Sequence, residues 1–139
     1  MRRRSHPSAY LAVGFMLFLL LSSGAEGANW LKVGEVKGRV ILYVDPDTVN
    51  RTGETVGAKT KEVKFEPVGV GDEDLVEVTG YTEFRCGRNQ FRPMETTYLY
   101  KSGKTERIAS EGMRTWKTIN RESTRILYDY LCKRPNVSF

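Results

Sequence analysis

Cys86 and Cys132 are the residues of this sequence whose chemistry is easiest to specify, because they are the only cysteines among 139 residues. Two thiols can close a disulfide within the chain, stay reduced in the interior, or link two chains. The only histidine, His6, lies near the N-terminus. Since catalytic triads, Cys–His dyads and most zinc sites need an imidazole, the rest of the chain cannot build such a site. We therefore predict that the protein is not an enzyme and holds no metal or cofactor.

Arginine and tyrosine side chains form a second group of candidate functional residues. Aromatic rings and arginine are the usual components of binding hot spots. A basic aromatic binding surface is therefore predicted from Arg88, Arg92, Tyr98, Tyr100 and Arg114. Arg92, Tyr98 and Tyr100 have the same parity within one predicted strand, so they are expected on one face of a sheet. The alternation leaves open whether that face is exposed.

The acidic run Asp72-Glu73-Asp74 is a third candidate, as a cation site. A calcium-binding loop typically alternates its acids with other residues and includes a glycine, in the form D-x-D-x-D-G. This run lacks that alternation, so a solvated loop is the favoured interpretation.

The first 25 residues have the pattern of a secretory signal peptide. Arg2-Arg3-Arg4 precedes an apolar run of twelve residues, and small residues follow. Cleavage after Ala25 or Gly27 fits the small-residue rule, and Ala25 is preferred, which leaves residues 26–139 as the mature domain. The alternative is an uncleaved membrane anchor, but the run is short against the roughly 20 residues of a spanning helix. No stable membrane insertion is expected after cleavage.

Removal of this segment changes the charge balance. The chain has 22 Lys and Arg against 17 Asp and Glu, and three of the basic residues lie in residues 1–25, so the mature chain carries 19 − 17 = +2. Residues 26–80 carry 7 − 11 = −4, and residues 81–139 carry 12 − 6 = +6. The basic second half could meet an anionic partner, but an ordinary solvated surface is the simpler interpretation. A nucleic-acid partner is not expected.

Hydrophobic periodicity predicts strands over most of the mature chain. Runs rich in β-branched and aromatic residues predict strands at residues 29–33, 39–44, 55–65, 75–86, 90–101 and 104–110. Residues 66–74, which include Pro67, are expected to form an exposed loop. Asp45-Pro46-Asp47 is expected to end the second strand. In the fourth strand, alternation places Phe84 and Cys86 on the buried face.

A helical period replaces the strand period from about residue 120. Asn120 is the predicted N-cap, and the apolar stripe consists of Thr124, Leu127, Tyr128, Leu131 and Cys132. Each cysteine lies on the apolar face of its own element, and these faces meet if the helix packs on the sheet. We predict a Cys86–Cys132 disulfide, which closes a loop of 132 − 86 = 46 residues. Two buried thiols and an intermolecular bridge are the alternatives. The predicted fold class is α+β, an antiparallel sheet of about six strands with a C-terminal α-helix packed on one face and tied by a disulfide.

The sequence resembles the bacterial surface-adhesin protein E family. The shared features are Trp30 with Lys32-Val33, then Tyr43-Val44-Asp45-Pro46-Asp47-Thr48-Val49, Phe84-x-Cys86 followed by Phe91-Arg92, Trp116-Lys117-Thr118-Ile119, Ser123 and Cys132. The resemblance implies a small exported protein. It also implies a sheet of about six strands with a C-terminal helix tethered by a disulfide to its concave side.

The resemblance carries functional expectations as well. The family's named member is an adhesin implicated in binding epithelial cells and matrix proteins, and it forms dimers. We therefore expect an exported, non-enzymatic binding or adhesion-type module of the cell envelope, in the periplasm or on the surface of a Gram-negative bacterium. The expected partner is a protein ligand of the envelope or the extracellular matrix, and homodimers are a further expectation. A periplasmic accessory module that binds an envelope component is the alternative.

Overall fold

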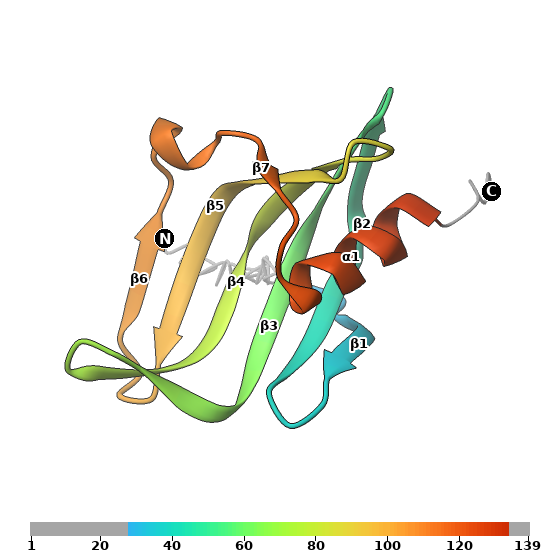
Figure 1. Cartoon of the computed structure of the whole chain (residues 1–139). Coiled ribbons are helices and arrows are strands. Elements are labelled where there is room, and N and C mark those ends of the chain that lie inside the picture. Colours follow the sequence, from blue (N-terminus) through green and yellow to red (C-terminus); the bar gives the residue numbers. More distant parts are fainter. Residues whose placement is uncertain (1–27, 134–139) are drawn as a thin grey trace, which may run out of the picture.

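An antiparallel sheet and one α-helix make up most of residues 28–133, the part of the chain that the computed structural model describes (Figure 1). The strands are β1 Leu31–Val36, β2 Val40–Thr52, β3 Thr55–Val70, β4 Glu73–Arg85, β5 Gln90–Tyr100 and β6 Thr105–Ile108. They are followed by the 3₁₀ turn η1 Glu111–Met113, the short strand β7 Lys117–Thr118 and the helix α1 Glu122–Lys133. The predicted signal peptide, residues 1–25, lies outside the described residues. Within those described, no helix is long and apolar enough to cross a bilayer.

Each of the first six strands pairs with its neighbours in the chain. The sheet order is β1-β2-β3-β4-β5-β6 with antiparallel pairing, and β7 pairs with β5. Antiparallel neighbours need only a tight connection. In the β4–β5 turn, Gly87 at φ 83° and Asn89 at φ 55° supply the left-handed conformations. The predicted α+β fold of about six strands with a C-terminal helix is confirmed.

Residues 66–74 do not form the predicted loop. β3 continues to Val70 and β4 begins at Glu73, so the two strands form one long hairpin. The register is irregular between Val63 and Val68, where Pro67 lies. An irregularity of this kind accommodates a residue that cannot donate to the ladder. Strand pairing therefore continues past the proline and glycine signals on which the loop prediction depended.

Asp45-Pro46-Asp47 does not end its strand either. β2 continues to Thr52, with an irregular register between Asp45 and Asn50. There the Asp47 amide donates to Asp45 Oδ1 at 3.1 Å, and the Thr48 hydroxyl donates to the Asp45 carbonyl at 2.7 Å. These local bonds satisfy polar groups that the ladder leaves unpaired around the proline. The chain bulges there and then resumes its pairing with β3.

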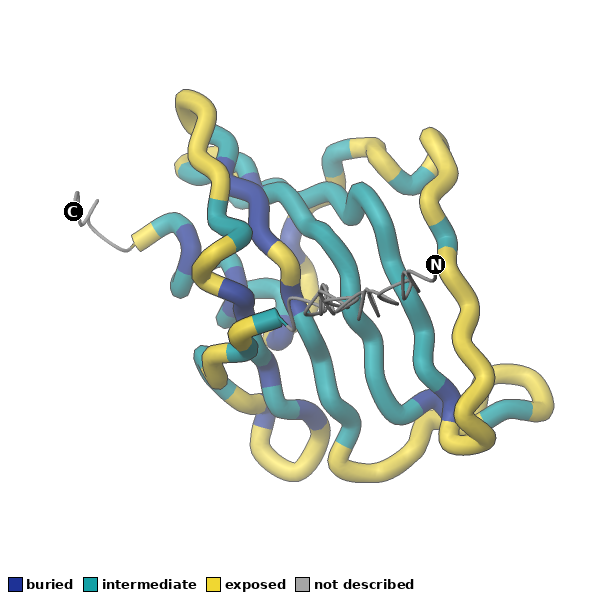
Figure 2. The backbone as a smooth tube through the Cα atoms, turned by 180° about the vertical axis from the view of Figure 1, so that it is seen from behind, coloured by how far each residue is buried: buried dark blue, intermediate teal, exposed yellow. Residues whose placement is uncertain are grey.

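The helix α1 packs on one face of the sheet, mainly over β1 and β2 (Figure 1). Leu127 and Leu131 of its apolar stripe are buried with Leu42, Val44 and Phe84 of the strands. We call this side of the sheet the helix-side face, and the opposite side the open face. Figure 2 shows the central strands mostly at intermediate burial, with exposed residues concentrated at the hairpin ends and along β6.

The two ends of α1 can be compared with the sequence prediction. Cys86 and Cys132 form the predicted disulfide, with their Cα atoms 5.5 Å apart. At the other end, the Arg125 amide donates to the Arg121 carbonyl at 3.0 Å. The residue whose carbonyl accepts the first helical bond is the N-cap. The cap is therefore Arg121, and the prediction of Asn120 was wrong by one residue.

Two hydrogen bonds also connect the C-terminal half of α1 to the sheet. The Gly87 amide donates to the Tyr128 hydroxyl at 2.9 Å. Arg51 of β2 donates to the Leu131 carbonyl at 2.5 Å. Because the last carbonyls of a helix have no partner within it, Arg51 acts as a C-terminal cap supplied by the sheet. The helix is thus held by covalent, polar and apolar contacts together.

Candidate functional site

A groove runs along the helix-side face where α1 does not cover it. Its volume is about 550 Å³, and it lies between α1 and strands β4, β5 and β6. The apolar and aromatic side chains that line it include Val78, Phe91, Tyr98, Ile108, Met113 and Leu127. Its polar and charged side chains include Thr82, Thr96, Lys117, Arg121 and Thr124, and β3 contributes Thr60 and Glu62. An apolar concavity with a few convergent polar groups is the usual form of a binding site.

Of the two predicted tyrosines, only Tyr98 lines this groove. Tyr100 is 6% exposed, and its hydroxyl donates to a carboxylate oxygen of Glu106 at 3.1 Å. Burial, followed by the bond to Glu106, raises the pKa of Tyr100. Tyr100 is therefore a structural residue at the end of β5 rather than a contact for a ligand.

The three predicted arginines lie elsewhere. Arg92 lies on the open face, where its guanidinium donates to Glu83 at 3.0 and 2.8 Å. Arg88 lies in the β4–β5 turn and pairs with Glu54 at 3.2 Å. Arg114 lies between η1 and β7. The structure therefore does not bring the five predicted residues together in one surface.

The prediction that Arg92 and Tyr98 lie on the same face of the sheet is wrong, because β5 has a bulge at Met94. The register between β4 and β5 shifts there, so that β5 has one residue more than its partner. One extra residue moves every later side chain to the other face of the sheet. Arg92 consequently lies opposite Glu83 on the open face, and Tyr98 lies opposite Val78 on the helix-side face.

Gly80 makes room for this bulge. A Cβ atom at Gly80 would lie 2.0 Å from the carbonyl oxygen of Glu95, far inside any real contact distance. A glycine within a strand often marks a bulge or a close backbone approach. The sequence therefore contained a signal for the bulge, although not for the side of the sheet to which each residue would turn.

Trp116 makes contacts with two arginines that the sequence did not predict. The guanidinium carbons of Arg85 and Arg92 lie 4.1 and 4.4 Å from the centre of its ring. The strand β7 brings the ring there, because Lys117 pairs with Phe91 of β5. Cation–π contacts of this kind hold the ring and both arginines in place. A strand of two residues shows no periodicity, which is why sequence reasoning missed it.

Other aromatic rings on the open face are also held by their neighbours. Lys61 Nζ lies 4.7 Å from the ring centre of Trp30 and 4.9 Å from that of Tyr43. Tyr81 lies over Gly57, where a Cβ atom would be 2.3 Å from the tyrosine hydroxyl. An aromatic ring packed over a glycine of the next strand is a known way to stabilise a sheet. The open face is thus a polar sheet surface carrying several fixed rings.

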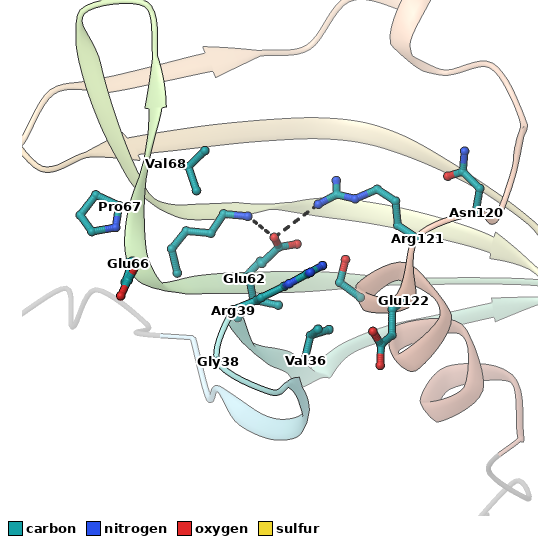
Figure 3. A pocket seen from close by; sticks show the side chains of 13 residues that line it. Val36, Gly38, Arg39, Glu62, Glu66, Pro67, Val68, Asn120, Arg121 and Glu122 are labelled. Carbon is teal, nitrogen blue, oxygen red and sulfur yellow. Dashed lines mark hydrogen bonds and ion pairs between the residues drawn. The ribbon is translucent and has the colours of Figure 1, made fainter.

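A second cavity, of about 540 Å³, lies beside the N-terminus of α1 (Figure 3). Glu62 lies in it and pairs with Lys64 and with Arg121, the latter at 3.6 Å. The ionisable residues that line it balance in charge, with Arg39, Lys64 and Arg121 against Glu62, Glu66 and Glu122. Of these six residues, Glu62, Lys64 and Arg121 are paired, and the equal numbers of acids and bases give no preference for a ligand of either charge. The acidic run 72–74 lies elsewhere, at the β3–β4 hairpin, where Glu73 pairs with Lys104 at 3.8 Å. In residues 28–133, no group of three or more His, Cys, Asp or Glu is arranged to hold a metal ion.

The fold and the disulfide indicate the class of protein to which this chain belongs. A small α+β domain with a disulfide between sheet and helix is typical of proteins that mature in an oxidising compartment. The family model described as surface-adhesin protein E matches residues 30–133. The chain therefore belongs to the surface-adhesin protein E family, and the resemblance seen in the sequence is confirmed. A comparison with curated proteins finds no match. Membership implies a surface adhesion module of a typically non-enzymatic family, and the family and the disulfide together indicate export.

Proposed function

We propose that the protein is an exported, non-enzymatic adhesion module that binds a protein ligand in the groove between α1 and strands β4 to β6. The observation that supports this site is the incomplete cover of the helix-side face, because α1 packs mainly over β1 and β2 and leaves an open concavity of about 550 Å³. That volume falls within the range of about 300–1,000 Å³ that is usual for binding pockets. The ligand is a protein of the extracellular matrix or of the cell envelope.

The chemistry of the groove favours an extended segment of the ligand with apolar side chains. Phe91, Tyr98 and Met113 offer apolar and aromatic contacts along it. Rings and methionine supply large contact areas, and methionine adapts to side chains of different shape. The exposed Lys117 at the rim has no ion pair within the described residues, so it is available to an acidic residue of the ligand.

Thr96 and Thr97 provide a matched pair of variants to test the groove. They are adjacent, both are half-buried, and they line cavities on opposite faces of the sheet. Thr96→Arg places a large side chain in the groove, whereas Thr97→Arg makes the same change on the open face. We expect the first variant to bind about tenfold more weakly, which corresponds to about 1.4 kcal/mol, and the second to bind as the unchanged protein does.

The measurement is a plate assay of the oxidised protein against purified extracellular-matrix proteins and envelope fractions. Saturable binding that Thr96→Arg weakens and Thr97→Arg spares supports the proposal. If the protein shows saturable binding to none of these targets, the proposed adhesion function is wrong. Equal weakening by both variants would show that the ligand does not occupy the groove.

Location is part of the same proposal. We propose that residues 1–25 are a signal peptide cleaved after Ala25, and that the mature protein lies at the surface of a Gram-negative cell. Mass spectrometry of the mature N-terminus tests the cleavage site. Digestion of the protein by protease added to intact cells would support surface display. Protection until the outer membrane is opened would instead support the periplasmic accessory module.

A further inference from the structure

We propose that the open face of the sheet holds a second binding site, which takes an acidic oligosaccharide across Tyr81. This site lies on the opposite side of the sheet from the groove and does not depend on the protein-ligand proposal. Two shallow cavities, of about 220 and 270 Å³, are both lined by Tyr81. Each is smaller than the roughly 300 Å³ at which pockets for drug-sized ligands begin. Together they suit a ligand made of two small linked units, one on each side of the tyrosine.

Aromatic rings fixed in place suit the C–H face of a sugar. Tyr81 is held over Gly57, and Trp30 is held against Lys61 at 4.7 Å. Burial, and secondarily the neighbouring Glu83, raises the pKa of Tyr81. Rings that are already ordered contribute contact area at little cost in conformational entropy. The open face therefore presents a prepared stacking surface.

Short polar side chains between the rings suit the hydroxyl groups of a sugar. The neutral hydroxyl and amide groups that line the two cavities are those of Asn50, Thr52, Thr55, Thr79 and Thr97. Hydroxyls and amides can both donate and accept hydrogen bonds, as sugar hydroxyls require. The same mixture offers little to an apolar ligand, because its polar groups would lose water without gaining partners.

One lysine of the smaller cavity, Lys59, favours an acidic sugar over a neutral one. Across the strands around the two cavities, the open face carries a balance of 5 − 4 = +1, from Lys59, Lys61, Arg85, Arg92 and Arg107 against Asp45, Glu77, Glu83 and Glu95. Glu83 pairs with Arg92 and Glu95 pairs with Arg107. Lys59 has no ion pair within the described residues, and it lines the smaller cavity. Its ammonium group is therefore placed to receive a carboxylate of the ligand.

The test is a titration of the oxidised protein, purified after export, followed through its backbone amide NMR signals. The probes are a hyaluronan tetrasaccharide and an alginate tetrasaccharide, which both carry uronic acids, and chitotetraose, which is neutral. We expect at least one acidic probe to bind and to shift the signals of Tyr81 and Thr97 on the open face. The acidic probe that binds more tightly identifies whether a matrix-type or a bacterial-type glycan is preferred.

Lysine variants separate this site from general attraction to a basic protein. Lys59→Glu is expected to weaken binding about tenfold, the effect of losing one charge-assisted contact. Lys101→Glu makes the same charge change at an exposed position in the β5–β6 turn and should leave binding nearly unchanged. Tyr81→Phe, which retains the ring, should bind better than Tyr81→Leu. The proposal would be overturned if neither acidic probe bound, or if the two lysine variants weakened binding equally. It would also be overturned if the signal shifts were confined to the groove around Thr96.

Discussion

Replacement of both bridge cysteines, as Cys86→Ala together with Cys132→Ala, should destabilise the protein by a predictable amount. The bridge joins residues 46 positions apart in the sequence. A cross-link of that span removes enough freedom from the unfolded chain to contribute about 4 kcal/mol in the loop-entropy model. A net stability of about 5–15 kcal/mol is usual for a domain, so the loss is a large share of it.

The native contacts of α1 should nevertheless keep the helix in place in this variant. Leu127 and Leu131 remain buried against the strands. Arg51 still donates to the Leu131 carbonyl, and the Gly87 amide still donates to the Tyr128 hydroxyl. We therefore expect an unchanged circular dichroism spectrum in the absence of denaturant. The effect of the double replacement should be on the unfolded chain rather than on the folded one.

Urea denaturation of three samples measures this effect. The oxidised protein, the same protein with its bridge reduced, and the double variant should each give a free energy of unfolding from the midpoint and slope. The reduced protein and the double variant should agree with each other, and reductant should not change the double variant. A loss below about 1 kcal/mol would refute the loop-entropy reasoning. A helical signal that disappears while the sheet persists would show that the bridge, and not the packing, holds α1.

Two further predictions concern β4 and β5. Gly80→Ala should destabilise the protein by about 2–3 kcal/mol, because the added methyl group clashes with a backbone carbonyl oxygen, which cannot move aside as a flexible side chain can. Gly112→Ala, where a Cβ meets nothing within 4 Å, is its control, and equal denaturation midpoints for the two variants would contradict the bulge geometry. The hydrogen bond from Arg107 lowers the pKa of Glu95 below its ordinary value of 4.5. The carboxylate therefore stabilises the fold above pH 4.5, and this stabilisation is lost as the pH falls through the lowered pKa. Near pH 7, Glu95→Gln should therefore have a slightly smaller free energy of unfolding than the unchanged protein, and the difference is small because the pair is exposed. A difference that grows on acidification would contradict this prediction.

The candidate site was only partly accessible from the sequence. Cys86 and Cys132 were correctly paired, and Tyr98, named for a binding surface, lies along the groove. Arg92 was assigned to the same face as Tyr98, and the bulge at Met94 reverses that. An inserted residue leaves no trace in the alternation of a short strand, because both halves of the strand keep a period of two. The face to which a side chain turns is therefore a property of the paired strands.

Local sequence by itself specified the six main strands, the C-terminal helix and their order. Alternation in 75–86 was enough to place Phe84 inward, and the stripe through Leu127 and Leu131 was enough to predict the face of the helix that packs. These patterns are local because side-chain direction follows from backbone period alone. The same logic predicted the bridge, since two buried faces in one small domain must meet.

Only the tertiary structure decided which surfaces are free to bind. It continued the β3–β4 hairpin through residues 66–74, and it placed α1 over β1 and β2 so that a groove remains beside β4 to β6. It also set Trp116 against Arg85 and Arg92, which are 24 or more positions away in the sequence (116 − 92 = 24). Contacts between distant segments depend on how whole elements pack, and that packing is a sum of many weak terms that no local pattern contains.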